Sequence, residues 1–199
     1  MNTYTIIKKP SCLNWESVPS VSMDYALHTE QIPISATAQV CYDDKALYVR
    51  LSAKEKNIRA VYTEPLDPPC EDSCLEFFFS PINGDLRYFN IEMNPNCCIY
   101  LGIASGIPDL VRLIPEDGIP FSPKAAFIEG GWEVTYEVPF EFIRRFFPTF
   151  APASGTTMRG NFFKCGELTD PQHFFSWNPI SEDIISFHRP CDFGLLVFE

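Results

Sequence analysis

The sequence predicts an all-β protein, an antiparallel β-sandwich with one short helix. Eighteen prolines and ten glycines in 199 residues favour many turns over long helices. A hydrophobic fraction of 46% and an aromatic fraction of 15% exclude a disordered chain and provide for a sizeable core. Short strand-like runs bounded by turn residues recur along the chain, which is typical of sandwiches and barrels.

The predicted strands follow one another from residue 36 to the end of the chain. Three pairs of strands flank short turns, at 43–45, 81–85 and 130–131, and each pair is expected to form a hairpin. The strands are expected at 36–42, 46–53, 74–80, 87–94, 98–104, 124–129, 132–138, 157–166 and 193–199.

One short helix is predicted at 139–148, because a proline stands at each end of this segment. No low-complexity linker or internal repeat divides the chain, so residues 1–199 are expected to form one domain. Residues 1–35, which include Trp15, are expected to cover one end of the sandwich.

The charge of the chain limits its partners. A formal charge of −11 and a pI of about 4.7 predict repulsion from a phosphate backbone, which excludes nucleic acid as a partner. The absence of Lys/Arg clusters and of long apolar runs also argues against a membrane. The first residues lack the apolar stretch of a signal peptide, so a cytoplasmic location is expected, or an extracellular one if a leader has been removed. The sequence does not specify an oligomeric state.

Eight cysteines raise the question of disulfides. In a cytosolic chain reduced thiols are favoured over disulfides. Cys41 and Cys74 stand in apolar strand-like runs, where a thiol packs as a small hydrophobic group.

Alternation of side chains along 74–80 and 87–94 predicts two distinct sheet faces. One face is apolar. The other places Glu76 on the same side as Asn90 and Glu92, with Tyr88 at one end. Such a face is either a solvated outer surface or a sugar-binding surface, since carboxylates and amides bind vicinal hydroxyls and aromatic rings stack on a pyranose. The apolar face comprises Leu75, Phe77, Phe79, Phe89, Ile91 and Met93.

A series of segments, taken in order and spacing, resembles the family 9 carbohydrate-binding modules (CBM9) over roughly residues 36–199. The resemblance implies a distorted, jelly-roll-like β-sandwich and a non-catalytic module of the kind attached to xylanases, which holds the end of a glycan between two tryptophans above a polar floor. It also implies structural calcium. The segments are ATAQVCYDDKALYVR (36–50), EDSCLEFFFSP (71–81), RYFNIEMNP (87–95), EGGWEVTYEVPF (129–140), RGNFFKCGE (159–167), FSWNP (175–179) and FHRPCDFGLLVFE (187–199).

Carried over residue by residue, the resemblance keeps the family's glutamate as Glu76. Asn90 and Glu92 stand where the family has arginine and asparagine, so the floor is modified. The first clamp tryptophan has no aromatic counterpart at 69–71, and the second corresponds to Phe187.

The predicted carbohydrate site therefore has a polar floor and aromatic walls. The segment 172–179 is expected to be a loop that brings Trp177 to the rim of the polar face as a replacement wall. The predicted site residues are Glu76, Tyr88, Asn90, Glu92, Trp177, Asn178, Phe187 and His188. If calcium binds, loop residues such as Asp67, Asp72 and Asp85 are candidate sources of oxygen ligands.

Two other functions remain open for the same face. Glu76 and Glu92 could act as the catalytic pair of a glycoside hydrolase, although two strands of one hairpin are expected to give a shallow face rather than a cleft. The aromatic rim could instead meet another protein.

The Met, His and Cys residues of the chain raise the further alternatives of a haem site, a zinc site and a catalytic thiol. A related sandwich holds haem through a Met and a His, for which Met93 and His173 are the candidates, although Met93 is favoured as a core residue. Cys165, His173, His188 and Cys191 lack the usual zinc spacings, so packed thiols and hydrogen-bonded imidazoles are favoured. A Cys165 nucleophile with His173 as base has no oxyanion motif beside it.

Overall fold

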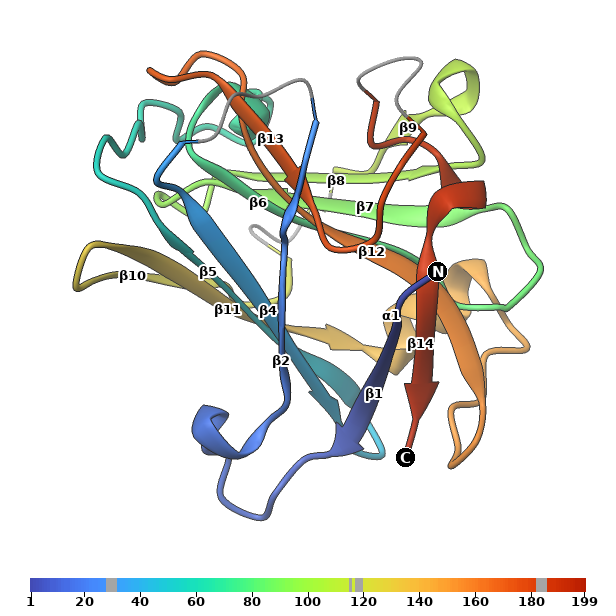
Figure 1. Cartoon of the computed structure of the whole chain (residues 1–199). Helices are drawn as coiled ribbons and strands as arrows, with labels where there is room; N and C mark the ends of the chain where they lie inside the picture. Colours follow the sequence, from blue (N-terminus) through green and yellow to red (C-terminus); the bar gives the residue numbers. More distant parts are fainter. Residues whose placement is uncertain (28–31, 115, 117–119, 182–185) are drawn as a thin grey trace.

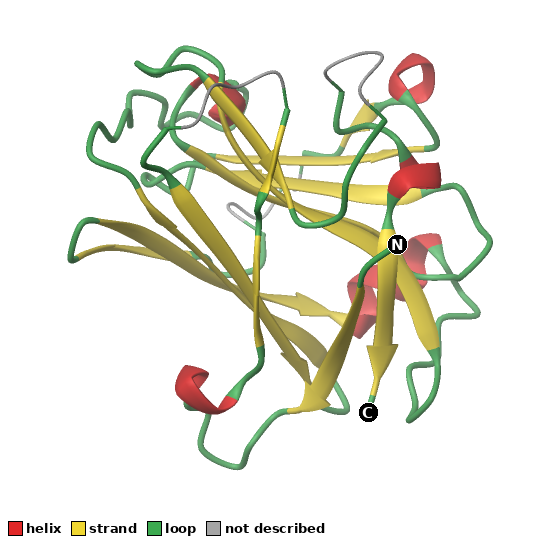
Figure 2. Ribbon diagram, viewed as in Figure 1, coloured by secondary structure: helices red, strands yellow, loops and turns green. Residues whose placement is uncertain are grey.

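The computed structural model describes residues 1–27, 32–114, 116, 120–181 and 186–199. These residues form a 14-stranded mixed sheet that curls so that its two halves face each other (Figures 1 and 2). The strands are β1 (Thr3–Lys8), β2 (Ser20–Ser22), β3 (Tyr25–Ala26), β4 (Ser35–Tyr42), β5 (Ala46–Lys54), β6 (Cys74–Ser80), β7 (Tyr88–Met93), β8 (Ile99–Ala104), β9 (Val111–Arg112), β10 (Lys124–Ile128), β11 (Gly131–Pro139), β12 (Thr157–Gly166), β13 (His173–Ser176) and β14 (Gly194–Phe198).

The helices are short. The described residues contain one α-helix, and none of their helices has the length and apolar character needed to cross a membrane. The α-helix is α1 (Phe140–Phe146), and the 3-10 turns are η1 (Trp15–Ser17), η2 (Pro69–Glu71), η3 (Ile107–Asp109) and η4 (Pro190–Asp192).

The all-β class and the short helix between two prolines are confirmed. The sheet is not purely antiparallel, however. Along the order β10-β11-β5-β4-β1-β14-β12-β6-β7-β8-β9, strand β1 pairs parallel with β14 and with β4. Parallel pairing requires partners that are distant in sequence, and β1 satisfies this because its neighbours come from the C-terminus and from beyond residue 34.

The N-terminal segment contributes strands as well as cover. Residues 3–8 join the two halves of the sheet, so this part of the segment 1–35 belongs to the sheet itself. Strands β1, β2, β3, β9 and β13 have no predicted counterpart, and β13 lies within the segment 172–179 that was expected to be a loop.

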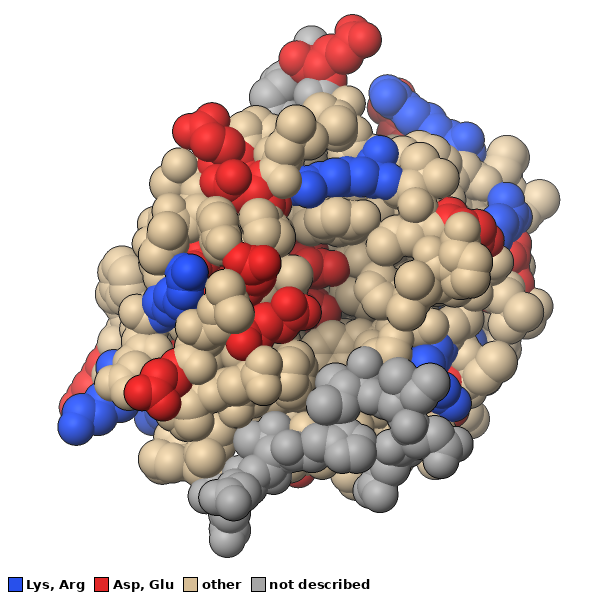
Figure 3. All heavy atoms as spheres, turned by 90° about the horizontal axis from the view of Figure 1, so that it is seen from above, with Lys and Arg blue, Asp and Glu red and all other residues tan. Residues whose placement is uncertain are grey.

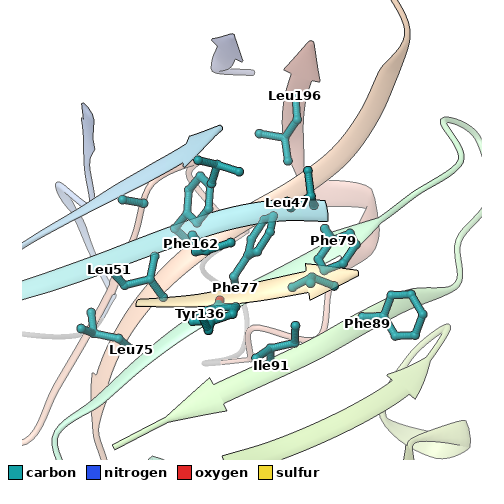
Figure 4. Close-up of a cluster of buried hydrophobic side chains, with 14 of the residues drawn as sticks. Leu47, Leu51, Leu75, Phe77, Phe79, Phe89, Ile91, Tyr136, Phe162 and Leu196 are labelled. Atoms are coloured by element: carbon teal, nitrogen blue, oxygen red, sulfur yellow. The ribbon is translucent and has the colours of Figure 1, made fainter. Parts of the chain in front are cut away.

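The core lies between the two halves of the sheet (Figure 4). Leu47 and Leu51 of β5 face Phe77 and Phe79 of β6 across it, and the rings of Phe77 and Phe79 stack with centroids 4.7 Å apart. The six side chains of the predicted apolar face all belong to this core. Period-two alternation therefore assigns both faces of β6 and β7 correctly, and the polar residues of these strands point out of the core.

The outer face of β6, β7 and β12 is not open to solvent. The turns η2 and η3 and the residues 186–188 rise around it at one end of the molecule. Figure 3 looks onto that end and shows acidic side chains gathered around a hollow.

Candidate functional site

A pocket of about 210 Å³ occupies the outer face of β6, β7 and β12. Its floor is formed by Glu76 and Phe78 of β6, Glu92 of β7 and Cys165 of β12. The sequence predicted a shallow face, and the hollow arises because distant segments supply Cys70, Ile107 and Glu167 at its edge. The face is therefore concave, and its polar groups are largely removed from solvent.

Two carboxylates lie together on this floor. Glu76 and Glu92 are directly opposite each other in the antiparallel pairing of β6 with β7, which places their Cβ atoms about 5 Å apart. Their exposed fractions are 2% and 7%. The prediction that both carboxylates share one sheet face is confirmed.

Burial makes ionisation of this pair difficult. Desolvation raises the pKa of Glu76 well above its usual value, and the charge of Glu92 adds to the rise. Desolvation also raises the pKa of Glu92, to about 7. The two groups titrate as a pair, so near neutral pH the pocket floor carries less than two full negative charges.

The oxygens of Glu76 differ in their partners. Oε1 accepts a hydrogen bond from the Cys165 thiol at 2.9 Å, whereas Oε2 has no hydrogen-bond partner. Desolvation raises the pKa of Cys165, so the thiol stays protonated and acts as a donor. One buried carboxylate oxygen is thus left available for a donor from a ligand.

Aromatic rings form one wall of the pocket. Half-buried Phe187 stacks on Phe163 with centroids 4.1 Å apart and planes only 10° apart. Phe174 meets Phe187 edge-on at 6.2 Å and lines the same pocket. Phe163 is fully buried on β12, so it holds the plane of Phe187 fixed.

His188 completes this wall beside Ser186. Its Nδ1 lies 2.8 Å from the hydroxyl of Tyr88, and its ring packs against Phe78 at 5.2 Å. Burial lowers the pKa of His188, so the imidazole is neutral at neutral pH. Tyr88 is fully buried beneath it and fixes the imidazole from below.

A family model described as "Carbohydrate-binding family 9" matches residues 7–198. The chain belongs to this family. No curated protein matches the sequence. Among solved structures, a protein from Bacteroides uniformis is 23% identical, with a TM-score of 0.78 and 99% of each chain covered.

Two further structures are family 9 modules from Caldicellulosiruptor kristjanssonii, each 13% identical to this chain. The first, in complex with cellotriose, has a TM-score of 0.70 and covers 100% of this chain and 94% of the module. The second, in complex with glucose, has a TM-score of 0.68 and covers 100% and 96%. At this identity the likeness establishes the family 9 fold.

Trp177 does not form a wall of the pocket. It is 4% exposed and lies in the core, 5.6 Å from the ring of Phe162. A Cβ added to Gly194 would lie 2.5 Å from the indole, so the ring fills the space beside the glycine. Its neighbour Asn178 also has a structural role, because its side chain accepts a hydrogen bond from the backbone amide of Asn2 at 2.7 Å.

Asn90 lies on the predicted face but not on the pocket surface. It sits between Phe78 and Gly102 on the neighbouring strands and is fully buried. Its amide lies near enough to Glu92 to oppose the rise of that pKa, yet neither amide atom makes a hydrogen bond of acceptable geometry.

His173 is part of a buried ion network on the other side of β12. Its Nε2 lies 2.7 Å from the ammonium of Lys164, and Lys164 forms a 3.1 Å ion pair with Glu55. Nδ1 lies 2.9 Å from the carbonyl of Pro171, which requires a proton on Nδ1 and leaves Nε2 as an acceptor. Desolvation lowers the pKa of His173 to about 4, and the charge of Lys164 adds to the effect.

Because its ring belongs to this network, His173 is not available as a haem ligand, a zinc ligand or a base for Cys165. Met93 lies in the core and His173 is bound to Lys164, so the pair does not form a haem site. Among the described residues the metal-ligand group of three is Cys74, Glu76 and Cys165, with ligand atoms within 4.8 Å of one another, and it includes no histidine. Desolvation raises the pKa of both thiols, whereas metal binding needs thiolates. All eight cysteines are unpaired in the structure.

The acidic loop residues suggested for calcium already accept protein donors. Asp72 is fully buried and accepts bonds from Arg59, the amides of Val61 and Tyr62, and Asn94. Asp67 accepts hydrogen bonds from the backbone amides of residues 63 and 64. Asp85 accepts one from the Arg87 side chain. These three carboxylates therefore do not fit a family 9 calcium site.

The other hollows include two of about 280 and 550 Å³ around β8, β9 and α1. Apolar residues such as Leu101, Leu113 and Ile114 dominate their walls, and they lack a buried carboxylate pair. The smaller acidic pocket is consequently the site with the more specific chemistry.

Several pocket residues were not predicted. Phe78 and Cys165 share the parity of Glu76 and Phe163 on their strands, so alternation alone could have identified them. Cys70, Ile107 and Glu167 lie on turns and loops and carry no such signal.

Proposed function

We propose that the chain is a non-catalytic module that binds a saccharide in the acidic pocket. The observation that carries this proposal is the juxtaposition of the Glu76–Glu92 pair with the fixed ring of Phe187 in one concavity. Carboxylates accept hydrogen bonds from neighbouring hydroxyls, while a flat ring packs against the C–H face of a pyranose.

The dimensions of the pocket favour a single sugar ring. About 210 Å³ is below the ~300–1,000 Å³ typical of sites for drug-sized ligands. The ligands of the two C. kristjanssonii modules, glucose and cellotriose, both contain a terminal ring of this kind. The pocket is therefore assigned to one terminal residue of a glycan, as the family resemblance implied.

The geometry favours binding over glycoside hydrolysis. Hydrolases place their two carboxyl groups on either side of the scissile bond. Glu76 and Glu92 instead rise from adjacent strands of one floor, so both meet the same side of a bound ring. Measurement of reducing-sugar release from polysaccharides tests the alternative directly, and no release is expected.

Titration calorimetry with glucose, xylose, cellobiose and other small saccharides tests binding. Glu76→Ala should weaken binding of the preferred sugar at least tenfold (~1.4 kcal/mol), because the ligand loses its hydrogen bond to a buried carboxyl group. Glu129→Ala is the matched control, since Glu129 is exposed on the β10–β11 turn. Binding of no saccharide, or equal affinity in the Glu76→Ala and control variants, would refute the proposal.

A further inference from the structure

The pocket is acidic and contains no cationic side chain to balance its carboxylates. Glu76, Glu92 and Glu167 line it, and the described residues around it include no Lys or Arg. Its one imidazole, His188, is held neutral by burial. Lys164 and Arg112, whose charges act on Glu76 and Glu92 respectively, lie outside the lining and bind elsewhere, Lys164 to Glu55 and Arg112 to loop carbonyls.

The buried floor of the pocket also contains a carboxyl oxygen without a hydrogen-bond partner. Glu76 is 2% exposed, and its Oε2 has no donor within the protein. An unpartnered polar atom in such a place costs free energy, and more so if it is charged. A donor from a ligand in the pocket would remove this cost.

A neutral hydroxyl meets the need only in part. It supplies one proton and no positive charge, so it does not offset the cost of ionising two neighbouring carboxyl groups in a buried site. An ammonium group supplies up to three donors and a positive charge, so it interacts favourably with both members of the pair.

The size and shape of the site narrow the kind of cation. A bare metal ion or a linear amine would not use the ring of Phe187, which is held parallel to Phe163 along the pocket wall. A pyranose that bears an amino group uses both features at once.

Building on the saccharide-binding function proposed above, we infer that this pocket selects a cationic amino sugar over the neutral sugar of the same ring. The ammonium lies between Glu76 and Glu92, and the C–H face of the ring packs on Phe187. Binding is accompanied by proton release, because a cation beside the pair favours its ionised form.

The experiment is calorimetric titration near pH 7 with methyl glucosaminide, methyl glucoside and methyl N-acetylglucosaminide. The free amine is expected to bind at least tenfold more tightly than the neutral glucoside, and acetylation should remove this gain. The observed binding enthalpy of the amine should change with the ionisation enthalpy of the buffer, as proton release requires, while that of the glucoside should change less.

Glu92→Gln tests the role of the charge, because it keeps the shape of the side chain and one acceptor oxygen. The ratio of amine to glucoside affinity should fall at least threefold, whatever the effect on either sugar alone. In Glu129→Gln, on an exposed turn, the ratio should stay at the wild-type value.

The outcomes separate the two proposals. If the glucoside binds as tightly as the amine, the amino-sugar inference is wrong and the saccharide-binding function stands. If neither sugar nor any other saccharide binds, both are wrong. A preference for the amine that survives Glu92→Gln unchanged also overturns the inference.

Discussion

Glu76 and Glu92 are direct cross-strand neighbours on the floor of one pocket, and each is more than nine-tenths buried. Desolvation raises the pKa of both groups, and the charge of Glu92 adds to the rise at Glu76. The pair is consequently a source of instability in the unliganded protein. This is the usual condition of a binding site, where stability is exchanged for affinity.

Replacing Glu92 by glutamine should stabilise the protein at high pH. The pKa of Glu92 is about 7 in the folded state and about 4.3 in an unfolded chain, so the folded protein binds more protons between these values. Stability linked to this group is therefore full below about pH 4 and declines as pH rises through 7. Urea unfolding should find Glu92→Gln close to wild type at about pH 4.5 and more stable by about 2–3 kcal/mol at about pH 8.

The quantity to measure is the difference in the free energy of unfolding between Glu92→Gln and wild type. His173 contributes an opposite trend to both proteins, since its folded pKa of about 4 lies below that of an unfolded histidine. A stability difference that stays constant across this pH range would show that Glu92 is ionised in the folded state throughout.

Lys164 should be essential for stability, although its neighbour Cys165 lines the pocket. Its ammonium is fully buried and pairs with Glu55 at 3.1 Å, and Glu55 also accepts from the Trp132 indole. Lys164→Met leaves the Glu55 carboxylate buried without its cation, which typically costs about 3–5 kcal/mol. Urea unfolding measures the loss.

Lys124→Met is the matched control, because Lys124 is exposed on β10. It should change the free energy of unfolding by no more than about 0.5 kcal/mol. The double variant Glu55→Gln with Lys164→Met should recover part of the loss, since it removes the unpaired charge. Equal stability of Lys164→Met and wild type would contradict the prediction and show that the ion pair contributes no net stability.

Strands β6 and β7 and the two faces of each were predictable, because they depend on the local alternation of side chains. Glu76 and Glu92 follow from the period of two and from the hairpin that joins their strands. The pocket was not predictable, because Ile107, Phe174 and Phe187 meet there from segments far apart in the chain. No local pattern encodes such an encounter.

The wrong prediction for Trp177 follows from a wrong secondary-structure prediction for its segment. The segment around it was interpreted as a loop, and a loop tryptophan near a polar face suggested a wall. In the structure β13 runs through residues 173–176, and the alternation extends to Trp177, which shares the core with Phe175. Phe174, of opposite parity, reaches the pocket instead.

Substitutions at Trp177 and Phe187 should therefore affect different properties. Trp177→Phe removes packing in the core and should cost about 1–3 kcal/mol of stability while sugar affinity stays unchanged. Phe187→Leu removes a partly exposed ring and should weaken sugar binding about fivefold to tenfold, with a stability loss of about 1 kcal/mol. Chemical denaturation and calorimetry on the same preparations separate the two effects, and the reverse pattern would place the stacking surface at Trp177.

Tyr88 should act on binding through His188 rather than by touching the ligand. Its ring is fully buried, its hydroxyl lies 2.8 Å from Nδ1 of His188, and only the histidine lines the pocket. Desolvation raises the pKa of Tyr88, so the hydroxyl remains protonated, and its hydrogen bond to Nδ1 fixes the orientation of the imidazole whose other edge faces the ligand.

Tyr88→Phe removes this bond and keeps the ring. The His188 imidazole should then lose its fixed tautomer and orientation, which ¹⁵N chemical shifts of the ring report, and sugar affinity should fall about threefold to tenfold. Tyr136→Phe is the matched control, because the Tyr136 hydroxyl is buried in the core without a hydrogen-bond partner. That control should keep wild-type affinity and equal or greater stability, since it removes a desolvated group that gains nothing from folding. If Tyr88→Phe left the His188 shifts and the affinity unchanged, the imidazole would be positioned by its contact with Phe78 alone.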